Sequence, residues 1–523
     1  MANKFYITTA IDYVNGPPHI GHALEKIQAD VLARYHRVKG DEVFFLTGTD
    51  EHGLKIFRAA QTAGQEVQRF VDETAQGYRN LKDVLNLSWD DFIRTSDQKR
   101  HWPGAQKLWQ QIFEAGDLYK KKYQGLYCVG CESFKTERDL VDGKCPDHQK
   151  EPEKIEQENW FFRLSKYQKE IEAKIASDEL KIIPESRKNE ILSFIRSGLE
   201  DISFSRPKKD LSWGVPVPND PDQIMYVWCD ALSNYITAIG YGEENPKSPL
   251  RQSYSARSDS SETRREASEI RLRPELRPRG NPKFNKWWPA DLHIIGKDIL
   301  RFHAAIWPGM LLSAKLLLPK AIFVHGFVTV EGQKMSKTLG NVINPFDLVE
   351  KYGTDPVRYY FLREIASHED GDFSVKKFED RYTADLANGL GNLVARTVTL
   401  GEKINPVKFD FSADIDLEIK KVCNDFYREY EHALGEMKLH EALASVWSLI
   451  SFADRYINEK KPWEIKGGEE LRKVLANSGY LLGMILNLVE PFLPQTGEKI
   501  RKQVWFSDSS VNFKKGENLF PRL

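Results

Sequence analysis

The sequence predicts an α/β domain with a small inserted zinc-knuckle domain, followed by an all-α helical bundle. Over roughly the first 370 residues, short apolar runs alternate with helical patterns, which is typical of strand–helix–strand units around a parallel sheet. Two cysteine-containing knuckles lie within this part, with the spacing of a zinc site. Beyond about residue 372 only long amphipathic helical patterns follow, which indicates a separate bundle.

Length and composition limit the possible classes of protein. The 523 residues suggest two to four domains, and 41% hydrophobic with 29% charged residues fit a globular protein. The net charge of −1 excludes a basic surface over the whole molecule, so any contact with nucleic acid must be local. Five cysteines argue against a disulfide scaffold and favour the reducing cytoplasm. No apolar run reaches the length of a membrane span, so we expect no membrane association.

The first predicted strand and helix flank a turn that carries two histidines. Residues Phe5–Ile11 form an apolar run typical of a buried strand, and an amphipathic helix follows the turn Pro17–His22. A helix N-terminus in this position favours an anion, usually phosphate, to which His19 and His22 could donate hydrogen bonds, and Gly21 permits close approach. Taken alone, the turn could also carry its two histidines by chance. The predicted apolar face of the helix consists of Leu24, Ile27, Val31, Leu32, Tyr35 and Val38.

A second strand, Val43–Leu46, leads to a polar loop on the ligand side of such a sheet. Asp50 in this loop could bind an ammonium group or simply cap the loop. Residues 54–118 are predicted to be helical, with tryptophans and tyrosines in the core, and Tyr119–Tyr127 is predicted to be a strand.

The zinc prediction rests on the residues Cys128, Cys131, Cys145 and His148. Two Cys-x-x-Cys or Cys-x-x-His knuckles about a dozen residues apart have the usual spacing of a four-ligand zinc site. Three thiolates and one imidazole fill a tetrahedral shell. No coordination position then stays open for a substrate, so we expect a structural ion.

After a strand at Glu158–Leu164, the pattern predicts a strand at Ile224–Cys229 that ends at Asp230, and a helix through Tyr235. Residues 247–283 then change character, with few apolar residues and eight Arg and two Lys against five acidic residues, which gives a net charge of +5. We expect a disordered insert here, either a solvated surface loop or an RNA-binding segment.

Order is predicted to return at Trp287. Leu292–Ile295 and Ala321–His325 are predicted strands, and the first of them leads to a helix through His303. A hairpin or loop at Val328–Gln333 then delivers the segment Lys334–Thr338. Beyond the helical bundle, the last residues of the chain are polar and are expected to fray.

Two motifs identify a family. His19–His22 and Lys334–Thr338 resemble the two signatures of class I aminoacyl-tRNA synthetases, in the same order and each after a strand. The second motif ends in Thr338 where serine is usual, which keeps a hydroxyl group. Within this class the chain resembles the methionyl-tRNA synthetase family from end to end, except at residues 247–283. Further matching segments are Tyr13–Gly16, Gly48–Gly53, Val227–Ala231, Ile295–Ile299 and Gly353–Tyr359, together with the zinc knuckles.

The resemblance implies a Rossmann-type class I synthetase catalytic domain and the activity of a methionine–tRNA ligase in the cytoplasm. Methionine and ATP, with Mg²⁺, would form methionyl-adenylate and pyrophosphate, and the methionyl group would pass to the 3'-terminal adenosine of tRNA(Met), including the initiator. A monomer is expected, because the chain lacks the C-terminal dimerising module of some members. The implied domains are the catalytic halves 1–117 and 196–325, the connective insertion 118–195, a stem-contact region 326–371, an anticodon-binding bundle 372–507 and a tail 508–523.

The resemblance also assigns roles to individual residues. His19 and His22 would hold the α-phosphate of ATP, and Lys334 and Lys337 would hold the departing β,γ-phosphates. The ATP site would further include Gly21, Gly296, Asp298, Met335 and Ser336. The methionine pocket would consist of Ile11, Tyr13, Asp50, Trp228, Leu232, Tyr235, Ile299 and His303, with Asp50 on the ammonium group. For each aromatic residue of this pocket, plain core packing is the alternative.

In the bundle, Asn392, Arg396, Pro462 and Trp463 match the anticodon-reading positions of the family. An exposed indole at Trp463 could stack on a splayed base, or Trp463 could instead pack two helices together. Two other functions fit the sequence less well. The insertion is too short for the editing domain of the leucine, isoleucine and valine enzymes, and closed zinc knuckles disfavour a cysteine enzyme. A non-catalytic tRNA-binding paralogue would not need both signatures.

Overall fold

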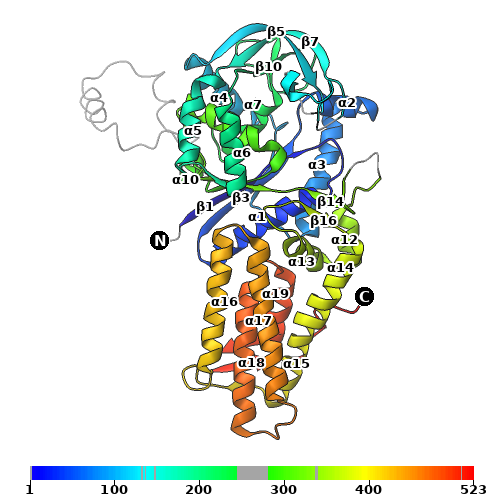
Figure 1. Cartoon of the computed structure of the whole chain (residues 1–523), viewed down its shortest axis with the longest axis vertical. Helices are drawn as coiled ribbons and strands as arrows, with labels where there is room; N and C mark the ends of the chain where they lie inside the picture. Colours follow the sequence, from blue (N-terminus) through cyan, green and yellow to red (C-terminus); the bar gives the residue numbers. More distant parts are fainter. Residues whose placement is uncertain are drawn as a thin grey trace, which may run out of the picture.

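The computed structural model describes residues 3–130, 133–135, 137–146, 149–243, 281–335, 340–507 and 509–523. The molecule is elongated, with an α/β part at one end and a helical bundle at the other (Figure 1). The predicted α/β domain and the predicted C-terminal helical region are therefore confirmed. Among the described residues, no helix is both long and apolar enough to cross a membrane.

A parallel sheet forms the centre of the α/β part, in the order β2-β3-β1-β12-β13-β8, with β4 beside β3. Because β3 and β12 lie on opposite sides of β1, the strand order reverses there. In such sheets the crevice at the carboxyl ends of the strands near this reversal binds ligands. The strands are β1 (Lys4–Thr9), β2 (Asp12–Tyr13), β3 (Glu42–Asp50), β4 (Asp91–Arg94), β8 (Lys181–Ile183), β12 (Leu292–Gly296) and β13 (Ala321–His325).

Helix α1 (Ile20–Val38) follows the histidine turn, as predicted. Its predicted apolar residues from Leu24 to Leu32 are buried, but Val38 is 61% exposed, because it is the last residue of the helix and lies beyond the core. The stretch 54–118 was predicted as helical throughout, yet it also contains β4, which is too short to show a period in the sequence. The other helices of this part are α2 (Leu54–Thr62), α3 (Val67–Val84), α4 (Trp102–Glu114), α5 (Gln168–Ala176), α6 (Glu185–Arg196), α10 (Pro282–Trp287) and α11 (Trp307–Ser313).

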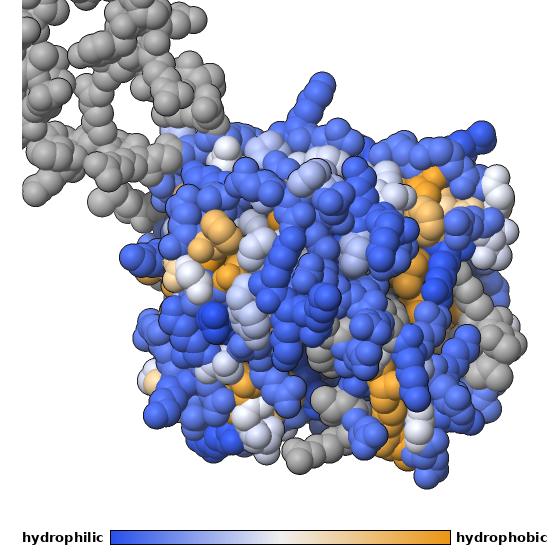
Figure 2. Space-filling view, turned by 90° about the horizontal axis from the view of Figure 1, so that it is seen from above, coloured by the Kyte–Doolittle hydropathy of each residue, from blue (hydrophilic) through white to orange (hydrophobic). Residues whose placement is uncertain are grey.

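The predicted insertion 118–195 divides between two sheets. Strands β6 (Ser133–Lys135), β5 (Leu118–Cys128), β7 (Glu153–Phe162) and β9 (Ile202–Ser203) form an antiparallel sheet at the end far from the bundle (Figure 1). Strand β8, however, pairs with β13 in the central sheet, with Ile183 opposite Phe323. The predicted insertion therefore includes a strand of the central sheet, whose three residues give no recognisable pattern in the sequence. Seen from this end, the surface is largely hydrophilic and is interrupted by a narrow hydrophobic band (Figure 2).

The predicted strand Ile224–Cys229 is wrong beyond Met225. Strand β11 (Gln223–Met225) pairs with β10 (Ser205–Pro207), and the chain then forms α7 (Val227–Leu232) and α8 (Asn234–Thr237). A short apolar run fits a buried strand and a buried helix equally well. The prediction chose a strand because the run is short, and this choice was wrong for Val227–Cys229.

Most of the predicted insert 247–283 lies outside the described residues, which resume at Asn281. The Asn281 side chain accepts a hydrogen bond from the Lys283 N–H and caps helix α10. The predicted insert therefore extends too far, because Asn281-Pro282 is a typical helix start. Shorter helical segments in the α/β part are Glu137–Asp139, Leu164–Tyr167, Lys297–Ile299 and Phe302–Ile306.

The predicted hairpin is confirmed: β14 (Val328–Val330) pairs antiparallel with β15 (Gln333–Lys334) and parallel with β16 (Gly371–Phe373). The helices that follow are α12 (Pro345–Tyr352), α13 (Thr354–Glu364), α14 (Val375–Arg381), a π-helix at Tyr382–Gly391, α15 (Asn392–Gly401), a short turn at Glu402–Ile404, α16 (Leu417–Gly435), α17 (Leu439–Lys460), α18 (Gly468–Val489) and α19 (Pro494–Gln503).

The bundle is not purely helical, and its tail does not fray. Strands β17 (Val407–Lys408), β19 (Ser510–Phe513) and β18 (Val504–Ser507) form a small sheet beside α18. Phe513, Leu519 and Phe520 are buried, and Tyr382 donates a hydrogen bond to the Pro521 carbonyl at 2.7 Å. The prediction of a frayed tail failed because apolar residues spaced among polar ones anchor it.

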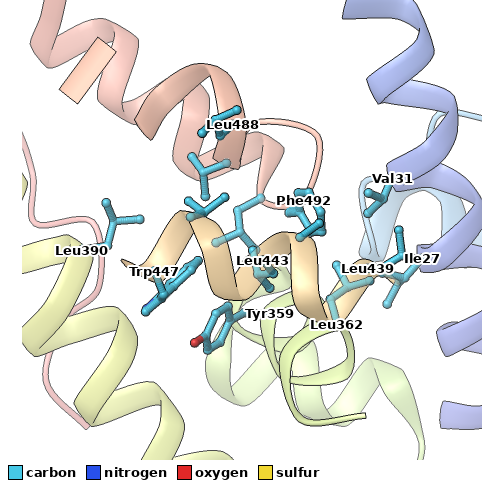
Figure 3. Packing of buried hydrophobic residues seen from close by; sticks show 14 of the residues in the cluster. Ile27, Val31, Tyr359, Leu362, Leu390, Leu439, Leu443, Trp447, Leu488 and Phe492 are labelled. Carbon is cyan, nitrogen blue, oxygen red and sulfur yellow. The ribbon is translucent and has the colours of Figure 1, made fainter. Parts of the chain in front are cut away.

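One hydrophobic core joins the α/β part to the bundle. Ile27 and Val31 of α1 lie beside Leu439 of α17 (Figure 3). The fully buried Arg358 of α13 pairs with Asp30 of α1 at 2.8 Å and donates to backbone carbonyls at the end of α18. The two parts are therefore held together by packing as well as by a buried ion pair.

Candidate functional site

A cavity of about 2200 Å³ opens at the carboxyl ends of β1, β3 and β12. It brings together predicted residues from distant parts of the sequence, namely Ile11, Tyr13, His19, His22, Asp50, Trp228, Leu232, Tyr235, Asp298, Ile299, His303, Lys334 and Met335. Gly21 and Gly296 adjoin this set, because a Cβ on either would come within about 3 Å of the His19 ring and the Asp298 carboxylate respectively. The predicted Ser336 and Lys337 lie outside the described residues.

His19 and His22 form the N-terminal cap of α1. Nδ1 of His19 accepts from the Gly21 N–H, and Nδ1 of His22 accepts from the His19 N–H, each at 3.1 Å. The two rings stack with their centroids 3.8 Å apart. Burial, followed by the neighbouring His19, holds the pKa of His22 well below its usual value. His22 is therefore neutral at physiological pH. In both rings Nδ1 accepts a backbone hydrogen bond, which leaves Nε2 as the nitrogen that can donate.

The Asp50 carboxylate lies at the end of β3 and is buried at the cavity. Strand β2 pairs with this end of β3, so Tyr13 lies opposite Asp50, and the Val14 N–H donates to the Asp50 carbonyl. The ammonium of Lys55, which also lines the cavity, lies 5.5 Å from the centre of the Tyr13 ring. An acidic group and an aromatic wall thus share one end of the cavity.

Aromatic rings and a neutral histidine form the rest of this end. Trp228 stacks on Phe302 with ring centroids 3.7 Å apart. His303 uses Nδ1 to donate to the Ile299 carbonyl at 2.9 Å, so its Nε2 accepts from the Tyr235 hydroxyl at 2.7 Å. Burial lowers the pKa of His303 to about 4, which keeps the ring uncharged. The walls therefore suit an apolar, polarizable side chain.

The groups expected to meet a nucleotide also line the cavity. Asp298 follows β12, and burial raises the pKa of its carboxyl group. Lys334 ends the hairpin strand β15, with its ammonium 5.5 Å from the centre of the Phe327 ring. Two histidines, one carboxyl group and a lysine thus line the same cavity.

A buried cluster that the sequence did not predict fixes helix α7. Asp230 lies between His52 at 2.5 Å and His101 at 2.6 Å, and all three side chains are buried. Although burial opposes its charge, the two histidines lower the pKa of Asp230 to about 2. The cluster ties the helix that carries Trp228 to the loop after β3. Phe302 was also missed, although it directly precedes His303 in the sequence.

Of the four predicted zinc ligands, Cys128 and Cys145 are described, and both are buried. Cys128 ends strand β5, and Cys145 begins a tight turn in which the Gln149 N–H donates to the Cys145 carbonyl. Two buried thiols at a strand end and a tight turn fit the donor chemistry of a zinc knuckle. Cys131 and His148 lie outside the described residues, and within those residues no three potential ligands gather in one place.

The predicted anticodon residues lie near the far end of the bundle. The guanidinium of Arg396 on α15 is 5.3 Å from the centre of the Trp463 ring and donates to Asp454 and Asn458 of α17. Trp463 is 49% exposed, just beyond the left-handed Lys461 that ends α17, while Pro462 beside it is buried and Asn392 is exposed. About half of the Trp463 side chain is therefore open to solvent, and the rest packs against Arg396 of α15.

Comparison with known proteins adds to this geometry. A profile of the family described as "tRNA synthetases class I (M)" matches residues 5–155 and 148–398. A relative from Caldanaerobacter subterraneus, named methionine–tRNA ligase, is 40% identical over 545 residues, which cover 100% of this chain and 79% of the relative. The chain belongs to the methionyl-tRNA synthetase family.

Other members of the methionyl-tRNA synthetase family are similar to this chain in sequence and in structure. A Thermotoga maritima methionine–tRNA ligase is 40% identical over 515 residues, covering 97% of this chain and 76% of the relative. The structure of Mycobacterium tuberculosis methionyl-tRNA synthetase in complex with methionyl-adenylate superposes with a TM-score of 0.87 at 34% identity, covering 99% of this chain and 100% of that one. The apo form of that synthetase gives a TM-score of 0.81 at 31% identity, covering 100% and 99% of the two chains.

Proposed function

We infer from this membership that the chain is a methionine–tRNA ligase: it activates methionine with ATP and passes the methionyl group to the 3'-terminal adenosine of tRNA(Met). One observation carries the inference. The residues predicted for methionine and those predicted for ATP, insofar as they are described, line a single cavity or adjoin it. Attack of the methionine carboxylate on the α-phosphorus of ATP requires both substrates in such a shared space.

In the activation step, negative charge develops on the phosphoryl oxygens as pyrophosphate leaves. His19 and His22, with their protons on Nε2 at a helix N-terminus, are suited to donate to oxygens of the α-phosphate. Lys334 and Lys337 would neutralise the β,γ-phosphates. Gly21, Gly296, Asp298, Met335 and Ser336 would complete the ATP site. Mg²⁺ bound with ATP would shield the phosphate charge.

At the other end, the Asp50 carboxylate would bind the ammonium group of methionine, in a buried place where a charge pair is strong. The thioether would lie among Ile11, Tyr13, Trp228, Leu232, Tyr235, Ile299 and His303. The uncharged state of His303 supports this assignment, because a charged ring would disfavour an apolar side chain.

Cys128, Cys131, Cys145 and His148 would hold one structural zinc ion that keeps the antiparallel insertion sheet in place. The buried positions of Cys128 and Cys145 support this. Metal analysis should find one zinc per chain. Cys145→Ser should lose it, whereas Cys423→Ser, a change of the buried cysteine of α16, should keep it. A wild-type protein without zinc would contradict the proposal.

In the tRNA-binding role, Asn392, Arg396, Pro462 and Trp463 would read the anticodon, and residues 326–371 would contact the stem. The exposed indole beside a guanidinium supports stacking on a base. We further propose that the chain acts as a monomer in the cytoplasm and also charges initiator tRNA. Sedimentation of the purified protein tests whether the chain is a monomer. Incubation of the protein with purified initiator tRNA, methionine and ATP tests whether it charges that tRNA.

Amino-acid-dependent exchange of pyrophosphate with ATP tests the activity. Run with Mg²⁺ and each of the twenty amino acids, the exchange should depend on methionine. Exchange with leucine or cysteine instead would mean another class I synthetase. Binding of tRNA(Met) without exchange for any amino acid would mean a non-catalytic paralogue.

A further inference from the structure

A buried ion pair lies behind two walls of the cavity without lining it. The Lys26 ammonium is 2.7 Å from Asp12 Oδ1, and the two residues are only 2% and 6% exposed. Lys26 also donates to Glu25 Oε1 at 3.1 Å, and the other oxygen of Glu25 is 3.0 Å from His325 Nε2. Neither Asp12 nor Lys26 has a role in the proposed chemistry.

On one side, this pair holds the methionine end of the cavity. Asp12 lies in strand β2 between Ile11 and Tyr13, both of which line the cavity. Successive side chains of an extended chain point to opposite sides, so Asp12 faces away from the cavity and toward α1. Since Tyr13 is paired with Asp50 across the sheet, a shift of Asp12 would move the ammonium site as well.

On the other side, the pair holds the nucleotide end. His22 precedes Lys26 by four residues on α1, so the two side chains share one face of the helix. The electrostatic interaction between them also reflects this proximity. Burial, His19 and the charge of Lys26 all lower the pKa of His22. A shift of Lys26 would therefore accompany a shift of the turn that carries both histidines.

The pair is a stiff connection because Asp12 has few other partners. Burial raises the pKa of Asp12 to about 7, and the Lys26 ammonium opposes that effect. Within the described part of the chain, Asp12 Oδ2 has no hydrogen-bond partner. Separating the pair would leave the buried carboxyl group without its ammonium partner. It must then take up a proton or stay uncompensated, and either outcome is costly. The two elements are thus expected to move together.

We propose that Asp12 and Lys26 are a positioning pair, which couples methionine binding to ATP binding by holding strand β2 against helix α1. The inference rests on the proposed assignment of the two ends of the cavity. Through this pair, seating of the nucleotide at His22 fixes the wall formed by Ile11 and Tyr13, and methionine binds more tightly to the fixed wall. By linkage, methionine tightens nucleotide binding by the same factor.

Calorimetric titration of methionine, with and without a saturating non-hydrolysable ATP analogue, measures this coupling. In the wild type the analogue should tighten methionine binding several-fold. Asp12→Asn and Lys26→Met should each reduce this ratio at least about threefold, and the double variant should bring it close to one. As a matched control, Lys188→Met breaks another Lys–Asp pair of 2.7 Å, that of α6 with Asp178, and should leave the ratio unchanged.

A wild-type ratio of one, or a double variant with the wild-type ratio, would overturn the proposal. If Lys26→Met fails to fold, Asp12→Asn and the double variant still test the proposal. In Asp12→Asn, Lys26 retains its hydrogen bond to Glu25. In the double variant, no buried ammonium remains without a partner. A uniform loss of methionine affinity at an unchanged ratio would mean a merely structural role. A wild type that binds no methionine would overturn the assigned activity itself, and with it the role of the pair.

Discussion

His19, His22 and His303 differ in role, yet in each of them a backbone group decides which ring nitrogen carries the proton. Two of them accept a backbone N–H with Nδ1, and His303 donates from Nδ1 to a carbonyl. The first two are thereby prepared to donate from Nε2, whereas His303 is prepared to accept there. A sequence motif names such residues, but only the fold around them selects the tautomer.

Lys334 should matter for the reaction more than for binding. In the proposed mechanism, Lys334 meets the charge that develops on the leaving pyrophosphate. Lys334→Ala should therefore lower the activation rate at least about a hundredfold, while methionine affinity should change little. Single-turnover formation of the adenylate measures the rate. Lys376→Ala, which removes an exposed lysine of α14, is the control and should react normally. A large loss of methionine binding at a near-normal rate would contradict the role.

His303 should make the fold sensitive to mild acid. Its pKa is about 4 in the folded protein, whereas an unfolded chain binds the proton near pH 6.5. Between these values the unfolded state binds more protons, so the free energy of unfolding falls as the pH falls from about 6.5 to 4, by about 1.4 kcal/mol per pH unit for this group. His303→Gln should flatten the curve of denaturant-measured stability against pH, and the exposed His432→Gln should not. Identical curves for His303→Gln and the wild type would reject this source of acid sensitivity.

At the scale of elements, the sequence predicted those that carry a long apolar run or a motif. β13 was predicted at its observed bounds, and β12 within one residue, because both are runs of five apolar or buried residues. The short strands β4 and β8 gave no pattern, and α7 looked like a strand. Most of the residues predicted for methionine and ATP from the motifs line one cavity, insofar as they are described. The cluster of Asp230 with His52 and His101 was not predicted, because His52 lies 178 residues and His101 lies 129 residues from Asp230 in the sequence.

The segment between Glu243 and Asn281 should be dispensable for activation of methionine. These two residues are joined by a hydrogen bond of 2.8 Å, so a short linker can bridge the gap without moving α8 or α10. Replacing residues 247–280 with a few Gly and Ser residues should leave pyrophosphate exchange nearly intact. Residues 281–283 are retained because they start α10; removing them as well should lower the melting temperature. Collapse of exchange in the shorter deletion would show that the segment serves the catalytic domain.

At the scale of the whole molecule, the bundle and the central sheet share one hydrophobic core. The core around Ile27, Val31 and Leu439 is continuous across the junction (Figure 3). Arg358, fully buried, links Asp30 of the signature helix to the carbonyls of Pro491 and Phe492. The proposed anticodon surface of the bundle and the cavity are therefore connected through one shared core.

Trp463 offers a way to separate recognition from chemistry across this distance. Its indole is half exposed beside Arg396, so Trp463→Ala should leave the melting temperature and methionine-dependent pyrophosphate exchange near normal. Loss of a stacked base costs about 1–3 kcal/mol, which corresponds to roughly fivefold to 160-fold weaker binding of tRNA(Met). Charging at limiting tRNA should fall accordingly and recover at high tRNA concentration. Trp505→Ala, at an indole of similar exposure on β18, is the matched control and should charge tRNA normally. Normal charging by Trp463→Ala would reject its role in reading the anticodon, and equal losses in both variants would point to a general effect on the bundle.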